Sequence, residues 1–245
     1  MFIPRLYYPH SIQTDEVLAL DKEMSHYLMT VLRLSDGAKV IFFNGEGGEF
    51  SGTFIADKKR AQVKINEFHN VSRESPIALH LGQALLRGDK MDLVIQKATE
   101  LGAHSITPVL SAHCAVKLPA DRQDKRLEHW QNIAQSACEQ SGRTQLPVIH
   151  TPTTLHNWSQ QAFTGVSLFG DTQNGKSLHT LPQNTAYRLA IGPESGWSDA
   201  EIKDLSAVGF TGFTLGPRIL RTETAGLAAL SVLQALFGDL SISAG

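Results

Sequence analysis

The hydrophobic positions follow two different patterns, and the change lies near residue 72. Before it, short alternating stretches are separated by polar or glycine-containing turns, which is typical of β-strands. One helix is predicted from Lys22 to Leu34, after Asp21 as its N-cap. Strands are predicted at Lys39–Asn44, Glu49–Ala56 and Ala61–Phe68. Short strands at this spacing indicate a small β-barrel formed by residues 1–72.

A polar segment without periodicity, Asn70–Pro76, is the predicted linker to a second domain that covers residues 73–245. Beyond it, strand patterns alternate with helix patterns. Strands are predicted at 77–86, 105–110, 147–150, 166–169, 187–191 and 212–215. Helices are predicted at 89–101, 121–140, 153–162, from 198 onward and at 223–237. Strands separated by helices predict a parallel sheet covered on both faces, so the second domain is assigned to the α/β class.

The last predicted helix, Glu223–Phe237, is apolar on almost every side. Such a helix cannot place its apolar residues in one stripe, so it is expected to be buried on most faces. Thr222 is predicted to cap it, because a threonine oxygen can accept from the free N–H groups of the first turn. Glu223 would add a favourable negative charge there.

The loop before this helix carries two arginines. Gly216 and Pro217 predict a sharp turn, and Arg218 and Arg221 follow within a few residues. A charged loop on a buried helix is typical of a binding site on a rigid support. A core helix preceded by an ordinary surface loop is the alternative interpretation.

A second strand, loop and helix show the same arrangement. The strand Tyr187–Ile191 leads into the turn-rich loop 192–196, and Ser198 with Glu201 forms a capping box that begins the next helix. The strand Gly212–Leu215 repeats this order. Two adjacent strands that end in glycine-containing loops form a crevice at their carboxyl ends, where open α/β sheets bind ligands.

Composition restricts the class of protein. Of the 245 residues, 42% are hydrophobic and 19% charged, which is typical of a soluble globular protein. The amino-terminal segment lacks the apolar core of a signal peptide, and no apolar run is long enough to cross a membrane, so a cytoplasmic location is expected. The net charge of −2 gives no general affinity for nucleic acid, and any RNA binding must come from local basic groups.

Cysteine and histidine spacing gives no indication of a metal site. Cys114 and Cys138 have no C-x-x-C partner, and the ten histidines include no H-x-x-x-H or H-E-x-x-H pair. We therefore expect neither a disulfide nor a bound metal.

Residues 170–177, G-D-T-Q-N-G-K-S, match the phosphate-binding loop G-x-x-x-x-G-K-[ST] and follow a predicted strand. A nucleotide hydrolase is therefore an alternative. That loop requires a following helix whose N-terminus points at phosphate. Here Pro182 follows closely and no helix fits, so an ordinary loop is predicted. The dinucleotide fingerprint G-x-G-x-x-G is absent after every predicted strand, which disfavours a standard Rossmann oxidoreductase.

Two motifs, I-G-P-E-S-G-W-S at 191–198 and L-G-P-R-I-L-R-T-E-T-A at 215–225, resemble the cofactor loops of the SPOUT methyltransferases. More narrowly, the chain resembles the 16S ribosomal RNA uridine-N3 methyltransferase family. The resemblance covers nearly the whole chain. It also includes the motifs at 3–5, 26–33, 88–102, 106–109 and 139–143.

This resemblance implies a PUA-like RNA-binding barrel joined to a trefoil-knotted methyltransferase domain. It also implies a homodimer, S-adenosylmethionine as methyl donor and ribosomal RNA of the small subunit as substrate. The family usually has glycine where this chain has Ser195, so a positive φ at that position would strain the loop.

Backbone groups of the glycine loops are expected to carry the cofactor, with apolar side chains enclosing its adenine. The predicted cofactor-binding residues are Phe169, Gly170, Ile191, Gly192, Pro193, Glu194, Gly196, Leu215, Gly216, Ile219, Leu220, Thr222, Thr224 and Ala225.

Methylation at uridine N3 requires loss of a proton and stabilisation of the resulting anion. Arg221 and Arg218 are candidates for this stabilisation, and Arg5, from this chain or a partner subunit, is another. Glu223 is a candidate general base, although a simple helix-terminal role fits it equally well.

Two basic groups are the candidate RNA-binding residues, and a solvated surface is the alternative for each. They are Lys58, Lys59 and Arg60, and Lys117, Arg122, Lys125 and Arg126. An RNA-binding module that keeps the fold without catalysing methylation is a further alternative.

Overall fold

The computed structural model describes residues 3–57, 60–114, 116 and 118–240. The chain forms two compact units. The first comprises Met1–Glu74 together with Cys138–Leu146, and the second comprises Ser75–Ala137 and Pro147–Gly245. Residues 138–146, predicted to belong to the second domain, thus pack with the first unit.

The first unit contains a five-stranded sheet. Its spatial order is β1 (Arg5–Tyr7), β3 (Lys39–Phe43), β4 (Glu49–Ile55), β5 (Gln62–His69) and β2 (Val17–Ala19). Alternate residues of β3, β4 and β5 point into its core, which includes Phe42, Phe54 and Val63. Within the described residues β1 and β2 are free edges, so the sheet is open and not the closed barrel that strand spacing suggested.

The predicted helix of this unit is interrupted. α1 (Lys22–His26) begins after Asp21, whose carboxylate accepts from the Met24 N–H at 2.7 Å as expected for an N-cap. A π-helical turn, Tyr27–Val31, then replaces the second half of the predicted helix.

The second unit is built on an eight-stranded sheet in which every described pairing is parallel, as predicted. Its order is β11 (Lys176–Ser177), β13 (Thr211–Thr214), β10 (Val166–Gly170), β12 (Ala186–Ile191), β6 (Ala78–Ala84), β7 (Ala103–Leu110) and β8 (Val148–Ile149), with β9 (Thr153–Thr154) also on β7. Its helices are α2 (Asp89–Glu100), α3 (Gln123–Ser141), α4 (Leu155–Ser159), α5 (Asp199–Ala207) and α6 (Thr222–Phe237). None of the described helices is long and apolar enough to cross a membrane.

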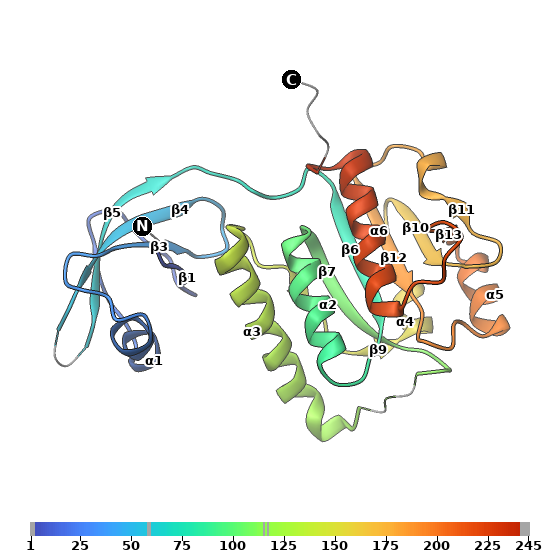
Figure 1. Ribbon diagram of the computed structural model, residues 1–245, viewed down its shortest axis with the longest axis horizontal. Coiled ribbons are helices and arrows are strands. Elements are labelled where there is room, and N and C mark those ends of the chain that lie inside the picture. The colour runs from blue at the N-terminus through green and yellow to red at the C-terminus, as the bar shows by residue number, and fades with distance from the viewer. Residues whose placement is uncertain (1–2, 58–59, 115, 117, 241–245) are drawn as a thin grey trace. The chain divides into compact units, whose positions relative to one another are not determined.

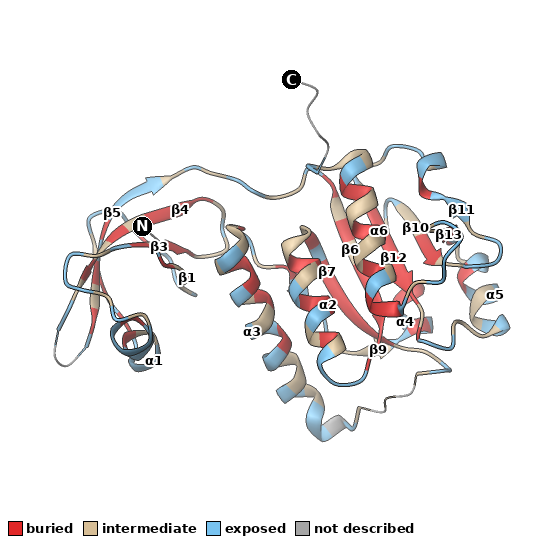
Figure 2. Cartoon of the chain, in the orientation of Figure 1, coloured by how far each residue is buried: buried red, intermediate tan, exposed pale blue. Residues whose placement is uncertain are grey.

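Helices cover both faces of this sheet, because successive strand residues point to opposite sides. Leu168 and Leu189 belong to the core beneath α2, α6 and the start of α3, whereas Phe169 and Ala190 join the core beneath α4 and α5. Figure 1 shows α2 and α6 side by side over the first face. Buried residues continue along β6, β7 and β12 in Figure 2.

α6 is less enclosed than its composition predicted. One face is buried, including Ala229, Leu230 and Leu233. The other apolar side chains, among them Val232 and Leu236, are only partly buried against the core. The described part of the chain therefore covers one side of this helix and leaves an apolar flank half exposed.

Candidate functional site

The carboxyl ends of three parallel strands form one edge of the second unit. β10 lies between β12 and β13, so the two glycine-loop strands predicted to be adjacent are separated by one strand. The loops that leave these ends are residues 171–175, 192–198 and 215–221. Ligands of open α/β sheets bind at such an edge, so the sheet order brings the predicted cofactor loops to a suitable place.

Thr222 links α6 to this edge through hydrogen bonds of its hydroxyl group. Its hydroxyl donates a short hydrogen bond to the carbonyl oxygen of Gly192 and accepts another from Nε2 of Gln83 at 3.2 Å. The predicted capping role of Thr222 is therefore wrong. Arg221 occupies the N-cap position and makes no side-chain capping bond. The threonine hydroxyl instead joins β6, the loop after β12 and α6.

Lys90, in the first turn of α2, links two acidic residues of the site. Its Nζ lies 3.6 Å from Oε1 of Glu194 and 3.3 Å from Oε1 of Glu223. Burial raises the pKa of Glu223, but a backbone hydrogen bond, Lys90 and Arg221 outweigh burial and leave that pKa below its ordinary value. Glu223 is consequently ionised at neutral pH and held by a lysine.

The loop glycines adopt the backbone conformation that glycine favours. Gly196 has φ of +75° and Gly216 has φ of +94°. Ser195, in contrast, is not among the residues with positive φ. It lies inside a turn closed by the hydrogen bond from Gly196 N–H to the Pro193 carbonyl, at 2.9 Å. Serine in place of the family's usual glycine therefore adds no backbone strain.

Three buried polar atoms near this edge lack a hydrogen-bond partner within the described residues. They are Oε1 of Gln83, Oε2 of Glu223 and Nε1 of Trp197. The Trp197 ring packs against Gly192, and Gly226 lies so close to Oε1 of Gln83 that a Cβ there would be 2.9 Å away. Buried polar groups are costly unless a partner completes them. Two acceptors and one donor suit a ligand with N–H groups and a ring acceptor, as the amino acid and adenine ends of S-adenosylmethionine provide.

The two motif arginines extend from this edge into solvent. Arg218 and Arg221 are exposed, and their side chains form no hydrogen bond or ion pair within the described part of the chain. Ile219 between them is 85% exposed, which is unusual for a large apolar side chain. This loop presents positive charge and apolar surface that a ligand could cover.

The remaining predicted cofactor residues differ in what they can offer. Phe169 and Ile191 have buried side chains that pack in opposite cores, so only their backbone groups face the edge. Leu215 and Ala225 pack partly on the core, and Thr224 is exposed. Gly170, Pro193 and Leu220 lie at the ends or within the loops of the site.

Arg5 occupies a different environment from the motif arginines. Its Nε donates to Glu49 Oε2 at 3.0 Å, and its terminal nitrogens donate to the carbonyls of Cys138 at 2.9 Å and Arg143 at 2.7 Å. Its guanidinium also lies 4.1 Å from the ring centre of Phe43. These partners all belong to the first unit, so the contacts of Arg5 indicate a structural role there.

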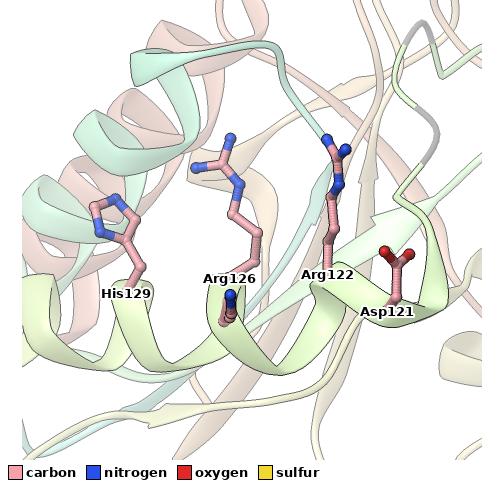
Figure 3. Close-up of a pocket in the computed structure, with 5 residues that line it drawn as sticks. Asp121, Arg122, Arg126 and His129 are labelled. Carbon is pink, nitrogen blue, oxygen red and sulfur yellow. The ribbon is translucent and has the colours of Figure 1, made fainter.

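Three of the predicted RNA-binding residues, Lys58, Lys59 and Lys117, lie outside the described residues. Arg60 is exposed. The other three come together at the start of α3. They are Arg122, Lys125 and Arg126, and they line an open cavity of about 470 Å³ together with Asp121 and His129. Figure 3 shows Asp121, Arg122, Arg126 and His129 along one side of this helix.

Residues 170–177 do not form a nucleotide-binding loop. Oδ1 of Asp171 accepts from the N–H groups of Gln173 and Asn174, each at 2.9 Å, so the backbone donors that would hold phosphate are already used. Lys176 and Ser177 form β11, and a single 3₁₀ turn follows in place of a helix. The expectation of an ordinary loop is confirmed.

Gln83 and Lys90 are the functional candidates that the sequence did not identify. A lysine at a helix N-terminus is electrostatically unfavourable, which is a weak signal that another contact requires Lys90. Gln83 lies in a predicted buried strand, where an uncharged polar residue needs a partner. The described residues contain no cluster of three or more histidine, cysteine or acidic side chains suited to a metal.

Two family models match the chain. The RNA methyltransferase domain model matches residues 73–234, and the RNA methyltransferase PUA domain model matches residues 20–66. This chain belongs to the RNA methyltransferase family. The ribosomal RNA small subunit methyltransferase E of Buchnera aphidicola (subsp. Schizaphis graminum) is 35% identical over 98% of both chains. The protein of the same name from Bacillus subtilis is 31% identical over 91% of both.

Solved structures of family members are also similar. A methyltransferase from Legionella pneumophila in complex with S-adenosylmethionine has a TM-score of 0.94 at 39% identity, covering 98% of this chain and all of that one. The ribosomal RNA small subunit methyltransferase E from Neisseria gonorrhoeae, also bound to S-adenosylmethionine, has a TM-score of 0.92 at 33% identity with the same coverage. The α/β methyltransferase fold and the PUA domain are thus those of the family.

Proposed function

We propose that this protein transfers a methyl group from S-adenosylmethionine to N3 of a uridine in ribosomal RNA of the small subunit. The observation that carries the proposal is the hydrogen-bonded junction of Thr222, Gly192 and Gln83. It joins the two cofactor motifs at the carboxyl edge of a parallel sheet. Relatives with the same fold bind this methyl donor, and the curated relatives are named for small-subunit ribosomal RNA.

The donor is proposed to lie against the backbone of loops 192–198 and 215–221. Gly196 and Gly216 allow the main chain to approach it closely. Gln83, Glu223 and Trp197 provide the buried acceptors and donor, and Ile219 covers the adenine. S-adenosylmethionine supplies an electrophilic methyl group on a sulfonium. The protein contributes by holding the methyl group in line with uridine N3. Binding energy then offsets the entropy that is lost when the two reactants are brought together.

Arg221 is the proposed stabiliser of the uracil anion, with Arg218 as the second candidate. Both guanidinium groups are exposed beside the cofactor loops and form no hydrogen bond or ion pair in the described structure, although the charge of Arg221 also acts on Glu223. A positive charge beside the uracil oxygens lowers the pKa of N3–H and stabilises the anion that attacks. The buried partners of Arg5 make it the least suitable of the three within one chain.

Glu223 is better placed to bind the donor than to remove a proton. Its pKa is lowered and Lys90 holds one of its oxygens, so it is a weak base. Its second oxygen, Oε2, has no partner in the described residues and can accept from a ligand N–H. Loss of the uridine proton to solvent is therefore the simplest route, once an arginine has lowered the pKa.

Homodimerisation and the trefoil knot are also proposed. The half-exposed apolar flank of α6, with Val232 and Leu236, supports a partner subunit on that side. The knot is proposed from the resemblance of the motifs at 191–198 and 215–225 to those of the SPOUT methyltransferases. The open sheet of the first unit is the proposed RNA-binding module, and a cytoplasmic location follows from the proposed substrate.

Methyl transfer to purified small ribosomal subunits tests the proposal. With radiolabelled S-adenosylmethionine, we expect label in the small-subunit RNA, and mass spectrometry should find 3-methyluridine in its nuclease digest. Label on another nucleotide would support methyltransferase activity but would show that N3 of uridine is not the methylated atom. No transfer by a protein that binds the donor would favour a non-catalytic RNA-binding module.

A further inference from the structure

A second, smaller cavity shares lining residues with the basic cavity at the start of α3. Its volume is about 160 Å³, and Arg122 and Arg126 line both cavities. Its floor is apolar and rigid, because Leu85, Met91 and Trp130 are almost completely buried core residues. Arg122 and Arg126 therefore lie at the boundary between the basic outer cavity and the apolar inner cavity.

This small cavity adjoins the proposed catalytic edge. Leu85 directly follows the end of β6, two residues after Gln83, which bonds to Thr222. Met91 follows Lys90, whose ammonium group contacts Glu194 of the loop after β12 and Glu223 of α6. The floor of the cavity thus includes residues that are close in sequence to Gln83 and Lys90 of the proposed cofactor site.

Described residues after β7 contact both regions. The Ala112 N–H donates to Oε1 of Glu201 at 2.8 Å, and the hydroxyl of Ser195 donates to the His113 carbonyl at 3.4 Å. Leu118 and Pro119, a few positions later in the sequence, form a wall of the small cavity. Residues close together in the sequence therefore contact the cofactor loop and line the cavity.

We propose that this cavity binds the uracil of the extruded substrate uridine; this rests on the proposed function. An apolar cavity of about 150 Å³ accommodates one benzene-sized ring, so 160 Å³ suits a pyrimidine and not the two fused rings of a purine. Enzymes that modify a base take it out of its stack, and an apolar floor replaces the lost contacts.

Charge complementarity supports a nucleotide as the occupant. Arg122, Lys125 and Arg126 outnumber the single carboxylate of Asp121 around the outer cavity, and His129 is engaged by Asp92 at 2.8 Å. Arg122 and Lys125 are exposed, so their charges are available to a phosphate that flanks the base.

Arg126 gives the cavity a basis for choosing uracil over cytosine. It is half buried, and its guanidinium carbon lies 6.0 Å from the ring centre of Trp130. Arginine carries only donors, and uracil presents carbonyl acceptors where cytosine presents an amino donor. Arg126 therefore pairs with O4 of uracil and leaves the amino group that replaces this oxygen in cytosine unsatisfied.

Filling the cavity tests the proposal without relying on turnover. The probes are a small-subunit RNA fragment that the wild-type protein methylates, the same RNA with an abasic site at the methylated position, and the same RNA with cytidine there. We expect wild-type protein to bind the uridine RNA about tenfold more tightly than the abasic RNA, the effect of one buried base. Leu118→Trp should bind both equally weakly, because the indole occupies the cavity.

Val148→Trp is the matched control, because Val148 is exposed on β8 and should leave the preference unchanged. Persistence of the tenfold preference in Leu118→Trp, or its absence in the wild-type protein, would overturn the assignment. Calorimetry with S-adenosylmethionine separates the two proposals. If the wild-type protein binds the donor and methylates RNA but lacks the predicted preference, the proposed function stands and the assignment of this cavity to uracil is wrong.

Arg126→Gln provides a second test if Leu118→Trp does not fold. Glutamine offers both a donor and an acceptor, so this variant should lose the preference for uridine RNA over cytidine RNA while still binding S-adenosylmethionine. Lys203→Gln, which removes an exposed charge on α5, is its control. Unchanged uridine preference in Arg126→Gln would contradict the role given to this arginine.

Discussion

Two loops leave neighbouring parallel strands at the same edge of the sheet, and both are rich in the residues of ligand-binding turns. After β10, residues 171–175 turn back on themselves, and Asp171 accepts from the N–H groups that a phosphate would need. After β12, Gly192 is instead held by Thr222 of α6, and buried polar atoms beside it lack partners in the described structure. Binding capacity thus depends on which backbone and side-chain groups the fold leaves available, and motif spacing alone does not determine it.

The largest expected difference is in turnover, between a variant that loses a charge before α6 and one that loses a charge after the loop 171–175. Arg221→Ala should lower kcat by about 10²–10³, the usual loss when one stabiliser of a developing anion is removed. Its affinity for S-adenosylmethionine and its unfolding midpoint should change little, because Arg221 is exposed. Lys176→Ala, in β11 at the end of the motif that resembles a nucleotide-binding loop, should retain wild-type turnover. Single-turnover methylation measures both, and a normal rate in Arg221→Ala would remove this residue from the mechanism.

Breaking the junction between the cofactor motifs should have the next largest effect. Thr222→Val keeps the shape of the side chain but leaves Gly192 and Gln83 without their partner, so we expect about tenfold weaker binding of S-adenosylmethionine. Thr222→Ser keeps the hydroxyl and should bind as the wild-type protein does. Calorimetric titration distinguishes them, and equal affinity of the valine and serine variants would show that the hydroxyl is not needed.

A substitution in the loop after β10 should lower stability without changing the affinity for S-adenosylmethionine, in contrast to Thr222→Val. Asp171→Ala removes the acceptor of two backbone N–H groups and should lower the free energy of unfolding by about 1 kcal/mol. Binding of S-adenosylmethionine should be unchanged. Chemical denaturation and calorimetry measure the two properties on one preparation. An affinity loss as large as that of Thr222→Val would mean that both loops contribute to the site.

The smallest expected effect concerns pH. The folded-state pKa of Glu223 is lowered, so its contribution to stability is present at neutral pH and is lost as pH falls below the usual carboxyl range through the folded pKa. Glu223→Gln should therefore show a weaker decrease in thermal midpoint on acidification than the wild-type protein. Glu128→Gln, exposed on α3, serves as the comparison. Identical acid dependence in wild type and Glu223→Gln would contradict the lowered pKa.

Local signals in the sequence predicted local structure well. The capping box is present: Ser198 accepts from the Glu201 N–H, and the Glu201 carboxylate accepts from the Ser198 N–H. The parallel order of the second unit likewise followed from the alternation of strands and helices, because a parallel connection requires a crossover. In both cases the interacting groups are close in sequence or imposed by chain geometry.

Features that depend on distant partners could not be predicted. Thr222 is an ordinary helix-capping residue by its position, and only the fold shows that Gly192 uses its hydroxyl. Arg5 gave no sign of its carbonyl partners, which lie more than a hundred positions away. Closure of the first sheet likewise depends on whether its edge strands meet, which no residue pattern encodes.

Calorimetric titration of the purified protein with S-adenosylmethionine and, separately, with ATP–magnesium decides which loops bind the ligand. We expect a single saturable site for the methyl donor, weakened in Thr222→Val, and no heat of binding with ATP–magnesium. Binding of ATP–magnesium without binding of the methyl donor would contradict this expectation, and would assign ligand binding to residues 170–177 instead of the loops that Thr222 joins.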